Sequence, residues 1–178
     1  MYQFNYKKVE TIEEAVNELS ANPESKILAG GMTLIPTMKQ RLASPEQLID
    51  IRNIKELNFI KEESNNIVIG STTNHYTVAS SDLIKNKLSS LSRLAEGIGD
   101  PHVRNMGTIG GAISNNDPTA DYPAACLGLG ATIKTNKREI SADDFFVSLF
   151  ETALEEDEIV VSISFPIISD SIYMKFPN

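Results

Sequence analysis

The sequence predicts an α+β protein in which a small parallel lobe precedes a larger lobe built on an antiparallel sheet. Over about the first 50 residues, short apolar strands alternate with amphipathic helices, which is the order of a parallel β-α-β-α-β unit. After Asn53 the pattern changes to strand pairs separated by charged turns, as in antiparallel hairpins. We therefore predict a small α/β subdomain at residues 1–55 and a larger antiparallel-sheet subdomain at residues 56–178.

Each element of the first lobe has a local signal. Thr11-Ile12-Glu13-Glu14 matches a capping box, so a helix is expected to begin there and to end at Asn22-Pro23. A second helix is expected to start near Thr33, because Pro36 is tolerated only in a first turn. Its inward residues would be Leu34, Ile35, Met38 and Leu42. Strands are expected at residues 4–6, 26–29 and 47–51.

The second lobe opens with a predicted hairpin of residues 58–60 and 67–70, followed by a helix over residues 82–96. Residues 97–123 then lack sustained periodicity. Unstructured segments of that length in a compact domain are usually functional or disordered. The regular spacing of Val103, Met106, Ile109 and Ile113 favours an ordered, functional segment. Beyond it we expect a short helix at residues 123–127 and strands at residues 131–134, 159–165 and 172–174.

The composition excludes several classes of protein. The 178 residues carry 16 Lys and Arg against 24 Asp and Glu, a formal net charge of −8, whereas nucleic-acid binders depend on clustered basic residues. The single cysteine, Cys126, excludes an internal disulfide framework and a self-contained iron–sulfur centre, and two histidines are too few for a histidine-rich metal site. No apolar run is long enough for a transmembrane segment. We therefore expect a soluble protein of cytoplasmic type.

Two diglycine loops are the strongest candidates for a ligand site. Gly30-Gly31 leaves a predicted strand and enters a helix, and Gly107-Thr108-Ile109-Gly110-Gly111 lies within residues 97–123. Glycine permits positive φ and lets a ligand approach the backbone, and N–H groups at a helix start can bind phosphate oxygens even in an acidic protein. Two such loops could converge on a diphosphate from opposite sides. A single diglycine is more often only a tight turn.

The common nucleotide-binding and catalytic motifs are absent from the sequence. No segment matches G-x-G-x-x-G or G-x-x-x-x-G-K-[ST], which argues against a Rossmann dehydrogenase and a P-loop ATPase. No Ser/His/Asp or Cys/His set can be assembled. We therefore predict neither a catalytic residue nor a metal ligand in this chain.

Several other residues allow two interpretations. Asp121 can cap a helix or accept hydrogen bonds from ligand hydroxyls such as a ribityl chain, and these roles are compatible. Arg104 is expected to brace its loop through carbonyl groups or a salt bridge, with direct phosphate contact as the minor alternative. His75 is expected at the surface or as a helix cap, and Cys126 as a small buried hydrophobic residue. The acidic residues 155–158 are expected to form a solvated turn.

The two loops also carry a resemblance to a known family. Leu28–Lys39 resembles the first FAD-binding motif of the flavoprotein (medium) subunits of molybdenum hydroxylases, and Ile98–Gly111 resembles the second. Within that family the likeness is greatest to the medium chains of aerobic-type carbon monoxide dehydrogenases, and it continues to Lys175-Phe176-Pro177. The resemblance implies the two-subdomain FAD-binding fold of the vanillyl-alcohol oxidase and cresol methylhydroxylase type, with FAD between the two lobes.

The resemblance further implies which residues bind FAD. Met32 and Ala112 depart from the family pattern, in which a polar or charged residue and an asparagine or serine, respectively, are common. Each departure would remove one side-chain hydrogen bond and leave the backbone cradle intact. The expected cofactor-binding residues are Ala29, Gly30, Gly31, Met32, Thr33, Leu34, Ile98, Thr108, Ile109, Gly110, Gly111, Asp121, Val160 and Lys175.

The function that the resemblance implies is electron transfer in an oxidoreductase complex. Such a subunit binds FAD non-covalently, takes electrons from the [2Fe-2S] clusters of an iron–sulfur small subunit and passes them to an external acceptor. Substrate oxidation takes place on a large subunit with the molybdenum cofactor. By the same resemblance, we expect this chain to lack the usual C-terminal domain of the family. The complex would be cytoplasmic, or peripheral at the inner membrane through its other subunits.

Two alternatives to this function stay open. The first is a flavin-free assembly or docking module of such a complex, which Met32 and Ala112 support and the intact second motif opposes. The second is a self-sufficient flavin oxidase, which would lack a substrate domain.

Overall fold

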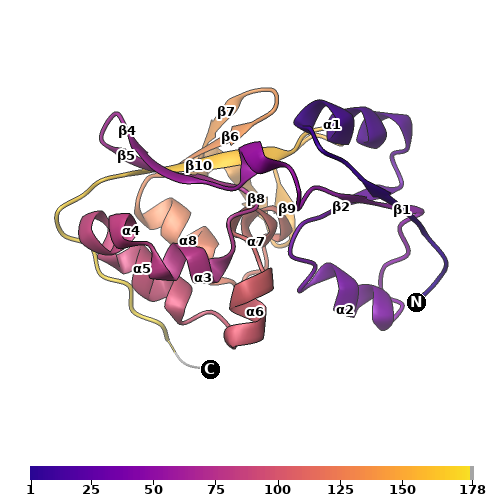
Figure 1. Cartoon of the computed structure of the whole chain (residues 1–178). Helices are drawn as coiled ribbons and strands as arrows, with labels where there is room; N and C mark the ends of the chain where they lie inside the picture. The colour runs from indigo at the N-terminus through magenta and orange to yellow at the C-terminus, as the bar shows by residue number, and fades with distance from the viewer. Residues whose placement is uncertain (177–178) are drawn as a thin grey trace.

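Two lobes, each with its own main sheet, make up the computed structural model, which describes residues 1–176 (Figure 1). The first sheet is parallel throughout, with strand order β1-β3-β2. One helix lies on each side of this sheet (Figure 1). The prediction of a parallel β-α-β-α-β unit is therefore confirmed. Its elements are β1 (Asn5–Lys8), α1 (Ile12–Ala21), β2 (Ser25–Leu28), α2 (Leu34–Lys39) and β3 (Gln47–Asp50).

The ends of the two helices follow from their sequences. The Thr11 hydroxyl accepts a hydrogen bond from the Glu14 N–H (3.1 Å), and the Glu14 carboxylate accepts one from the Glu10 N–H (2.8 Å), which satisfies free donors at the start of α1. Helix α2 ends at Lys39, and Arg41 turns the chain with a φ of 62°. The prediction that Leu42 points inward is wrong, because its side chain lies beyond the helix and is 76% exposed.

The second lobe is built on a five-stranded antiparallel sheet. Its strand order is β4-β5-β10-β6-β7, and every neighbouring pair is antiparallel. The hairpin predicted near residues 58–70 is present, but the segment 172–174, predicted as a strand, forms none. The strands are β4 (Ile60–Glu63), β5 (Asn66–Gly70), β6 (Thr132–Thr135), β7 (Glu139–Ser141) and β10 (Val160–Pro166); β8 (Phe146–Ser148) and β9 (Glu151–Thr152) form a separate pair.

Helices α3 to α8 lie together on one side of this larger sheet (Figure 1). The helix predicted over residues 82–96 is two helices, because Leu88 leaves helical geometry at φ −150° and ψ 62°. Residues 97–123, predicted as an ordered segment without periodicity, contain two short helices and the start of a third. The bounds are η1 (Lys55–Leu57), α3 (His75–Ser80), α4 (Asp82–Lys87), α5 (Ser89–Glu96), α6 (Pro101–Met106), α7 (Ile109–Asn115), α8 (Asp121–Gly128) and α9 (Ala142–Phe145).

One apolar cluster joins the two lobes. Ile159, immediately before β10, and Leu57 pack with buried residues of the small lobe such as Ala15 and Ile49. The core of the small lobe therefore includes a side chain from the far end of the sequence. The subdomain limits 1–55 and 56–178 stay a prediction, and Pro177 and Asn178 lie outside the described residues.

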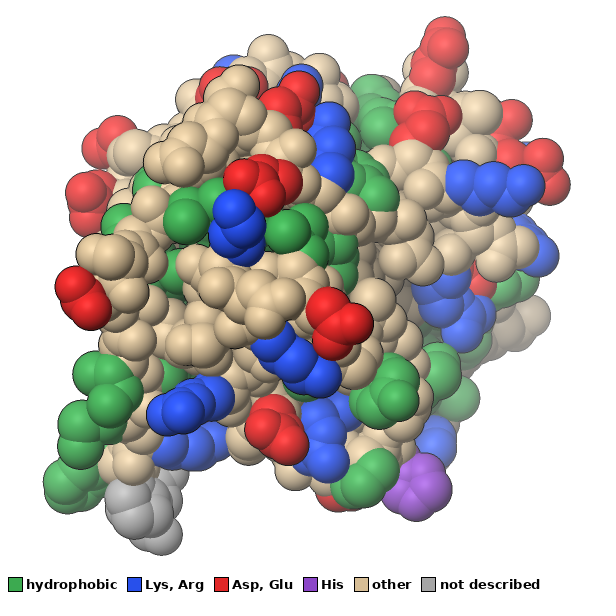
Figure 2. Space-filling view, turned by 60° about the vertical axis from the view of Figure 1, so that its left-hand side comes forward, with side chains coloured by type: hydrophobic (Ala, Val, Ile, Leu, Met, Phe, Trp, Pro, Cys, Tyr) green, Lys and Arg blue, Asp and Glu red, His purple; other side chains and the backbone are tan. Residues whose placement is uncertain are grey.

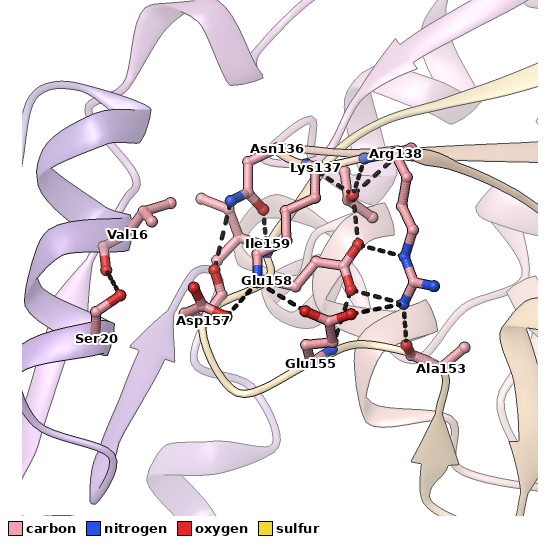
Figure 3. A network of polar contacts seen from close by, with 11 residues as sticks. Val16, Ser20, Asn136, Lys137, Arg138, Ala153, Glu155, Asp157, Glu158 and Ile159 are labelled. Atoms are coloured by element: carbon pink, nitrogen blue, oxygen red, sulfur yellow. Dashed lines mark hydrogen bonds and ion pairs between the residues drawn. The ribbon is translucent and has the colours of Figure 1, made fainter.

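A polar network fixes Ile159 in this position (Figure 3). Asn136, in the turn between β6 and β7, donates its backbone N–H to the Ile159 carbonyl (3.1 Å) and accepts the Ile159 N–H on its side chain (2.8 Å). The neighbouring Glu158 carboxylate is fully buried and accepts hydrogen bonds from Arg138 (3.0 Å) and Thr135 (2.6 Å). The prediction of a solvated acidic turn is therefore wrong for Glu158, whose pKa the Arg138 guanidinium lowers to about 2.

Candidate functional site: two loops that meet between the lobes

The two glycine loops are in direct contact at Gly30. A Cβ atom on Gly30 would lie 2.2 Å from the Met106 carbonyl oxygen and 2.7 Å from the Gly107 Cα. Only a residue without a side chain allows two backbones to approach this closely. The next residue, Gly31, has a φ of 71°, which also favours glycine. The two loops therefore meet, as expected, and a diphosphate held between them stays a prediction.

The first loop offers a row of backbone donors. Within the described residues, the five N–H groups from Gly30 to Leu34 have no hydrogen-bond acceptor in the chain. Each of these residues is also partly or largely exposed to solvent. Clustered, unpaired N–H groups carry partial positive charge and bind anionic oxygens without any basic side chain. This loop can therefore hold a diphosphate in a protein whose net charge is −8.

Most backbone N–H groups of the second loop already donate hydrogen bonds within the chain. The N–H of Ile109 donates to the Thr73 carbonyl (3.1 Å), and that of Gly110 donates to the Ser71 carbonyl (2.9 Å). The Thr108 side chain accepts from the N–H of Gly111 at 3.2 Å. These bonds fix the loop rigidly to the segment that follows β5. Its backbone thus shapes the site, and the anion donors come mainly from the first loop.

Two predicted residues that lie far apart in the sequence meet at the start of α8. The Lys175 ammonium lies 3.1 Å from one carboxylate oxygen of Asp121, and the Tyr173 hydroxyl donates to the other. Asp121 is the first helical residue and Ala120 the N-cap, so the capping interpretation of Asp121 is wrong. Its carboxylate is instead held by the C-terminal segment. Sequence reasoning missed Tyr173.

Along the C-terminal segment, side chains that face the protein alternate with side chains that face solvent. This alternation is the signal that could have revealed Tyr173. Ser171 bonds to Ser90 (2.6 Å), and Tyr173 and Lys175 turn toward Asp121. The residues between and after them are exposed. Hydrophobic side chains accordingly gather on the surface beside the C-terminal end in Figure 2; those of this segment are Ile172, Met174 and Phe176.

The remaining predicted residues lie around the loops in different ways. Ala29 and Leu34 are partly buried against apolar clusters of the small lobe, and Met32 is 36% exposed. Ile109 and Val160 point into the core of the large lobe, and Ile98 packs against that core. Cofactor contact by these residues stays a prediction.

Arg104 and Cys126 behave as expected. The Arg104 guanidinium donates to the carbonyl groups of Ile98 (3.1 Å) and Gly99 (3.2 Å), so it braces the loop before α6. Cys126 is fully buried, and burial raises the pKa of its thiol to about 12. Neither residue is placed to do chemistry.

His75 corrects a prediction. It is neither a surface residue nor a cap, because Asn74 caps α3 and the His75 side chain is 5% exposed. Its ring packs against Tyr122, with 5.3 Å between the ring centroids. Burial lowers the pKa of His75 to about 4, although the nearby Asp121 charge opposes the shift. His75 is therefore neutral at neutral pH.

This buried histidine makes the folded state sensitive to mild acid. As the pH falls from about 6.5 to about 4, the unfolded chain gains a proton on His75 that the folded chain does not bind. We expect the free energy of unfolding to fall by up to about 3 kcal/mol over this range. Denaturant unfolding of the wild type and of His75→Phe at several pH values measures the effect. A wild type whose pH dependence matches that of His75→Phe would contradict it.

An exposed loop of unpaired N–H groups, set between a parallel lobe and an antiparallel lobe, is suited to the diphosphate of a flavin dinucleotide. The comparisons with known proteins agree. Residues 2–168 match the family model described as the FAD binding domain in molybdopterin dehydrogenase, and the chain belongs to this family. FAD is accordingly its cofactor, and the donors of the first loop fit it.

Individual relatives support the same assignment. The chain is 39% identical to the glyceraldehyde dehydrogenase medium chain of Sulfolobus acidocaldarius, an alignment covering 93% of this chain and 60% of the relative. It is 40% identical to the carbon monoxide dehydrogenase medium chain of Hydrogenophaga pseudoflava, an alignment covering 92% of this chain and 59% of the relative. The chain thus spans about 60% of the length of these relatives.

Solved structures show the same fold. Carbon monoxide dehydrogenase from Hydrogenophaga pseudoflava superimposes with a TM-score of 0.92 at 40% identity, covering 94% of this chain and 60% of that one. Quinoline 2-oxidoreductase from Pseudomonas putida 86 also gives 0.92, at 29% identity, with the same coverage. The expected fold is confirmed. Among the described residues, no helix is long and apolar enough to cross a membrane.

Proposed function

We propose that the chain is the FAD-binding part of the medium subunit of a molybdenum hydroxylase complex. In this role it would receive electrons from the [2Fe-2S] clusters of a small subunit and deliver them to an external acceptor, while a large subunit oxidises the substrate. Relatives named as medium chains of carbon monoxide dehydrogenase and glyceraldehyde dehydrogenase support the proposal. FAD supplies the redox chemistry, because it can exchange electrons one or two at a time.

The residues of this chain have the tasks of binding and orienting. We propose that the N–H groups of residues 30–34 hold the diphosphate, and that Thr108 and Gly111 close the site from the second loop. Asp121 and Lys175 would contact the polar groups further along the cofactor. No side chain needs to move a proton, which agrees with the lack of a catalytic set. The unpaired N–H groups of the first loop are the observation that carries this proposal.

Gly111 offers the cleanest test of the site. A Cβ there would contact only the Thr108 hydroxyl (2.9 Å) and, at 3.9 Å, the Ala29 Cβ, so it would project between the loops without meeting backbone. We expect Gly111→Val to raise the FAD dissociation constant at least about 100-fold by blocking the site. Because the new Cβ displaces the Thr108 hydroxyl that caps α7, we also expect the FAD-free protein to lose about 1 kcal/mol of stability and to stay folded. Flavin fluorescence quenching on titration with FAD measures the affinity.

Gly128→Val is the matched control for Gly111→Val. Gly128 is also helical, and a Cβ on it would have open space around it. Equal FAD affinity in the two variants would contradict the site. A substitution at Gly110 would test the site less cleanly than the sequence suggests. A Cβ added there would lie 2.6 Å from the Ser71 carbonyl oxygen and would disturb the fold.

The electron-transfer role needs a separate experiment. The FAD-loaded chain, completed by its small subunit, should lose the oxidised flavin absorption when the iron–sulfur clusters are reduced. Dithionite reduction of the same sample serves as the positive control. If dithionite bleaches the flavin and the reduced small subunit does not, the electron route is wrong, although the FAD site stands.

A further inference from the structure

Four groups near the contact between the two loops touch one another in turn. Gly30 lies against Gly107, as described above, and the imidazole of His75 also lies close to Gly107. A Cβ on Gly107 would be 2.6 Å from the His75 Nε2 atom. The ring of Tyr122 packs against the imidazole, with the two ring planes tilted by 36°. The imidazole therefore occupies the space that a side chain on Gly107 would need, next to the backbone that touches Gly30.

Backbone contacts tie His75 to the same loop. Its N–H donates to the Gly107 carbonyl (3.0 Å), and the neighbouring Asn74 side chain donates to the Asn105 carbonyl (3.0 Å). The start of α3 is thus bonded to the residues on both sides of Met106, whose carbonyl faces Gly30. These bonds hold the residue that carries the imidazole against the second loop.

The choice of histidine is not explained by the stability of the folded chain. Its Nδ1 atom is buried and has no hydrogen-bond partner among the described residues. An unpaired buried polar atom destabilises a fold, whereas an apolar ring at the same place would carry no such penalty. The Tyr122 hydroxyl is likewise buried without a partner among these residues. What sets the His75 ring apart is that its other nitrogen, Nε2, packs against Gly107 in the second loop.

We propose that His75 is a positioning residue that sets the separation of the two glycine loops and, through it, the width of the diphosphate site. The imidazole fills the space next to Gly107, where a side chain on that residue would lie. A smaller side chain would let the second loop withdraw, and a longer ring would push it forward. The link to FAD rests on the proposed function, but the effect on the loops does not.

The first test uses the protein without FAD. Hydrogen–deuterium exchange of His75→Ala and His75→Phe should be at least about tenfold faster than wild type in residues 103–112, most of whose N–H groups are hydrogen-bonded, and unchanged in β10. Tyr122→Phe is the control, since it removes a hydroxyl that has no partner among the described residues and keeps the ring. Unchanged exchange of residues 103–112 in both His75 variants would overturn the proposal, whatever the protein's ability to bind FAD.

The second test separates positioning from stability. His75→Ala leaves a cavity and should lower the melting temperature of the FAD-free protein, whereas His75→Phe removes the unpaired nitrogen and should lower it less. Both should nevertheless raise the FAD dissociation constant at least about tenfold. If FAD affinity instead follows the melting temperature across the two variants, His75 has only a packing role. A wild type that holds no FAD would refute the proposed function and leave the exchange test to decide on His75.

Discussion

Replacing Gly30 with valine is expected to separate the two glycine loops and to abolish FAD binding. The new Cβ would lie 2.2 Å from the Met106 carbonyl oxygen, and backbone on both sides would have to move. Overpacking of this kind costs about 1–3 kcal/mol of stability. Because the first loop also carries the free N–H groups, we expect the FAD dissociation constant to rise more than about 100-fold. Chemical denaturation and flavin titration measure the two effects.

Comparing Gly30→Val with Gly111→Val separates the loss of FAD binding from the loss of stability. Gly111→Val blocks the same site from the second loop without a backbone collision, so it should lose FAD and keep most of its stability. Gly30→Val should lose both. A Gly30→Val protein with normal stability would show that the two loops do not rest on each other as described.

Replacing Arg138 with methionine is expected to give the largest loss of stability. The Glu158 carboxylate is fully buried, and Arg138 is its only cationic partner among the described residues. The Arg138 side chain is 46% exposed, so Glu158 is the buried member of the pair. Removing Arg138 leaves a buried charge without its cationic partner, at a cost of about 2–3 kcal/mol. The contribution of Glu158 is fully present above pH 4.5 and is lost as the pH falls toward about 2. The deficit of the variant should therefore shrink over that range in denaturant unfolding.

Lys137→Met provides the matched control for Arg138→Met. Lys137 is the adjacent residue, and it pairs with Glu155 and Asp157, which are well exposed (Figure 3). Exposed ion pairs contribute about 0–1 kcal/mol. Equal losses in the two variants would contradict the distinction between the buried Glu158 carboxylate and the exposed carboxylates of Glu155 and Asp157.

Much of the fold and of the site could be predicted from the sequence, because the signals were local. The capping box at Thr11 located the start of α1, and the diglycines at 30–31 and 110–111 located the two loops. Glycine is informative where two backbones meet, since no other residue permits the contact. Periodicity failed in residues 97–123, because α6 and α7 are too short for an apolar stripe to show.

Other features depend on contacts that no local pattern contains. The buried state of His75 arises from Tyr122 and from Gly107, both distant in sequence. In the sequence, Glu158 is simply the last residue of an acidic run. Only the fold places Arg138, from a neighbouring turn, against its carboxylate. The N–H groups of Ile109 and Gly110 are free donors in sequence terms, and only the packing of residues 71–73 shows that they are occupied.

The placement of Ile159 has a consequence for how the chain folds during synthesis. The small lobe is complete in sequence once Leu57 has been made, yet its core also requires Ile159. About a hundred further residues must therefore emerge from the ribosome before Ile159 can join this core. We expect the apolar surface that Ile159 covers to stay open in the nascent chain until then. The small lobe, which carries the first glycine loop, would reach its final packing only once β10 has been made.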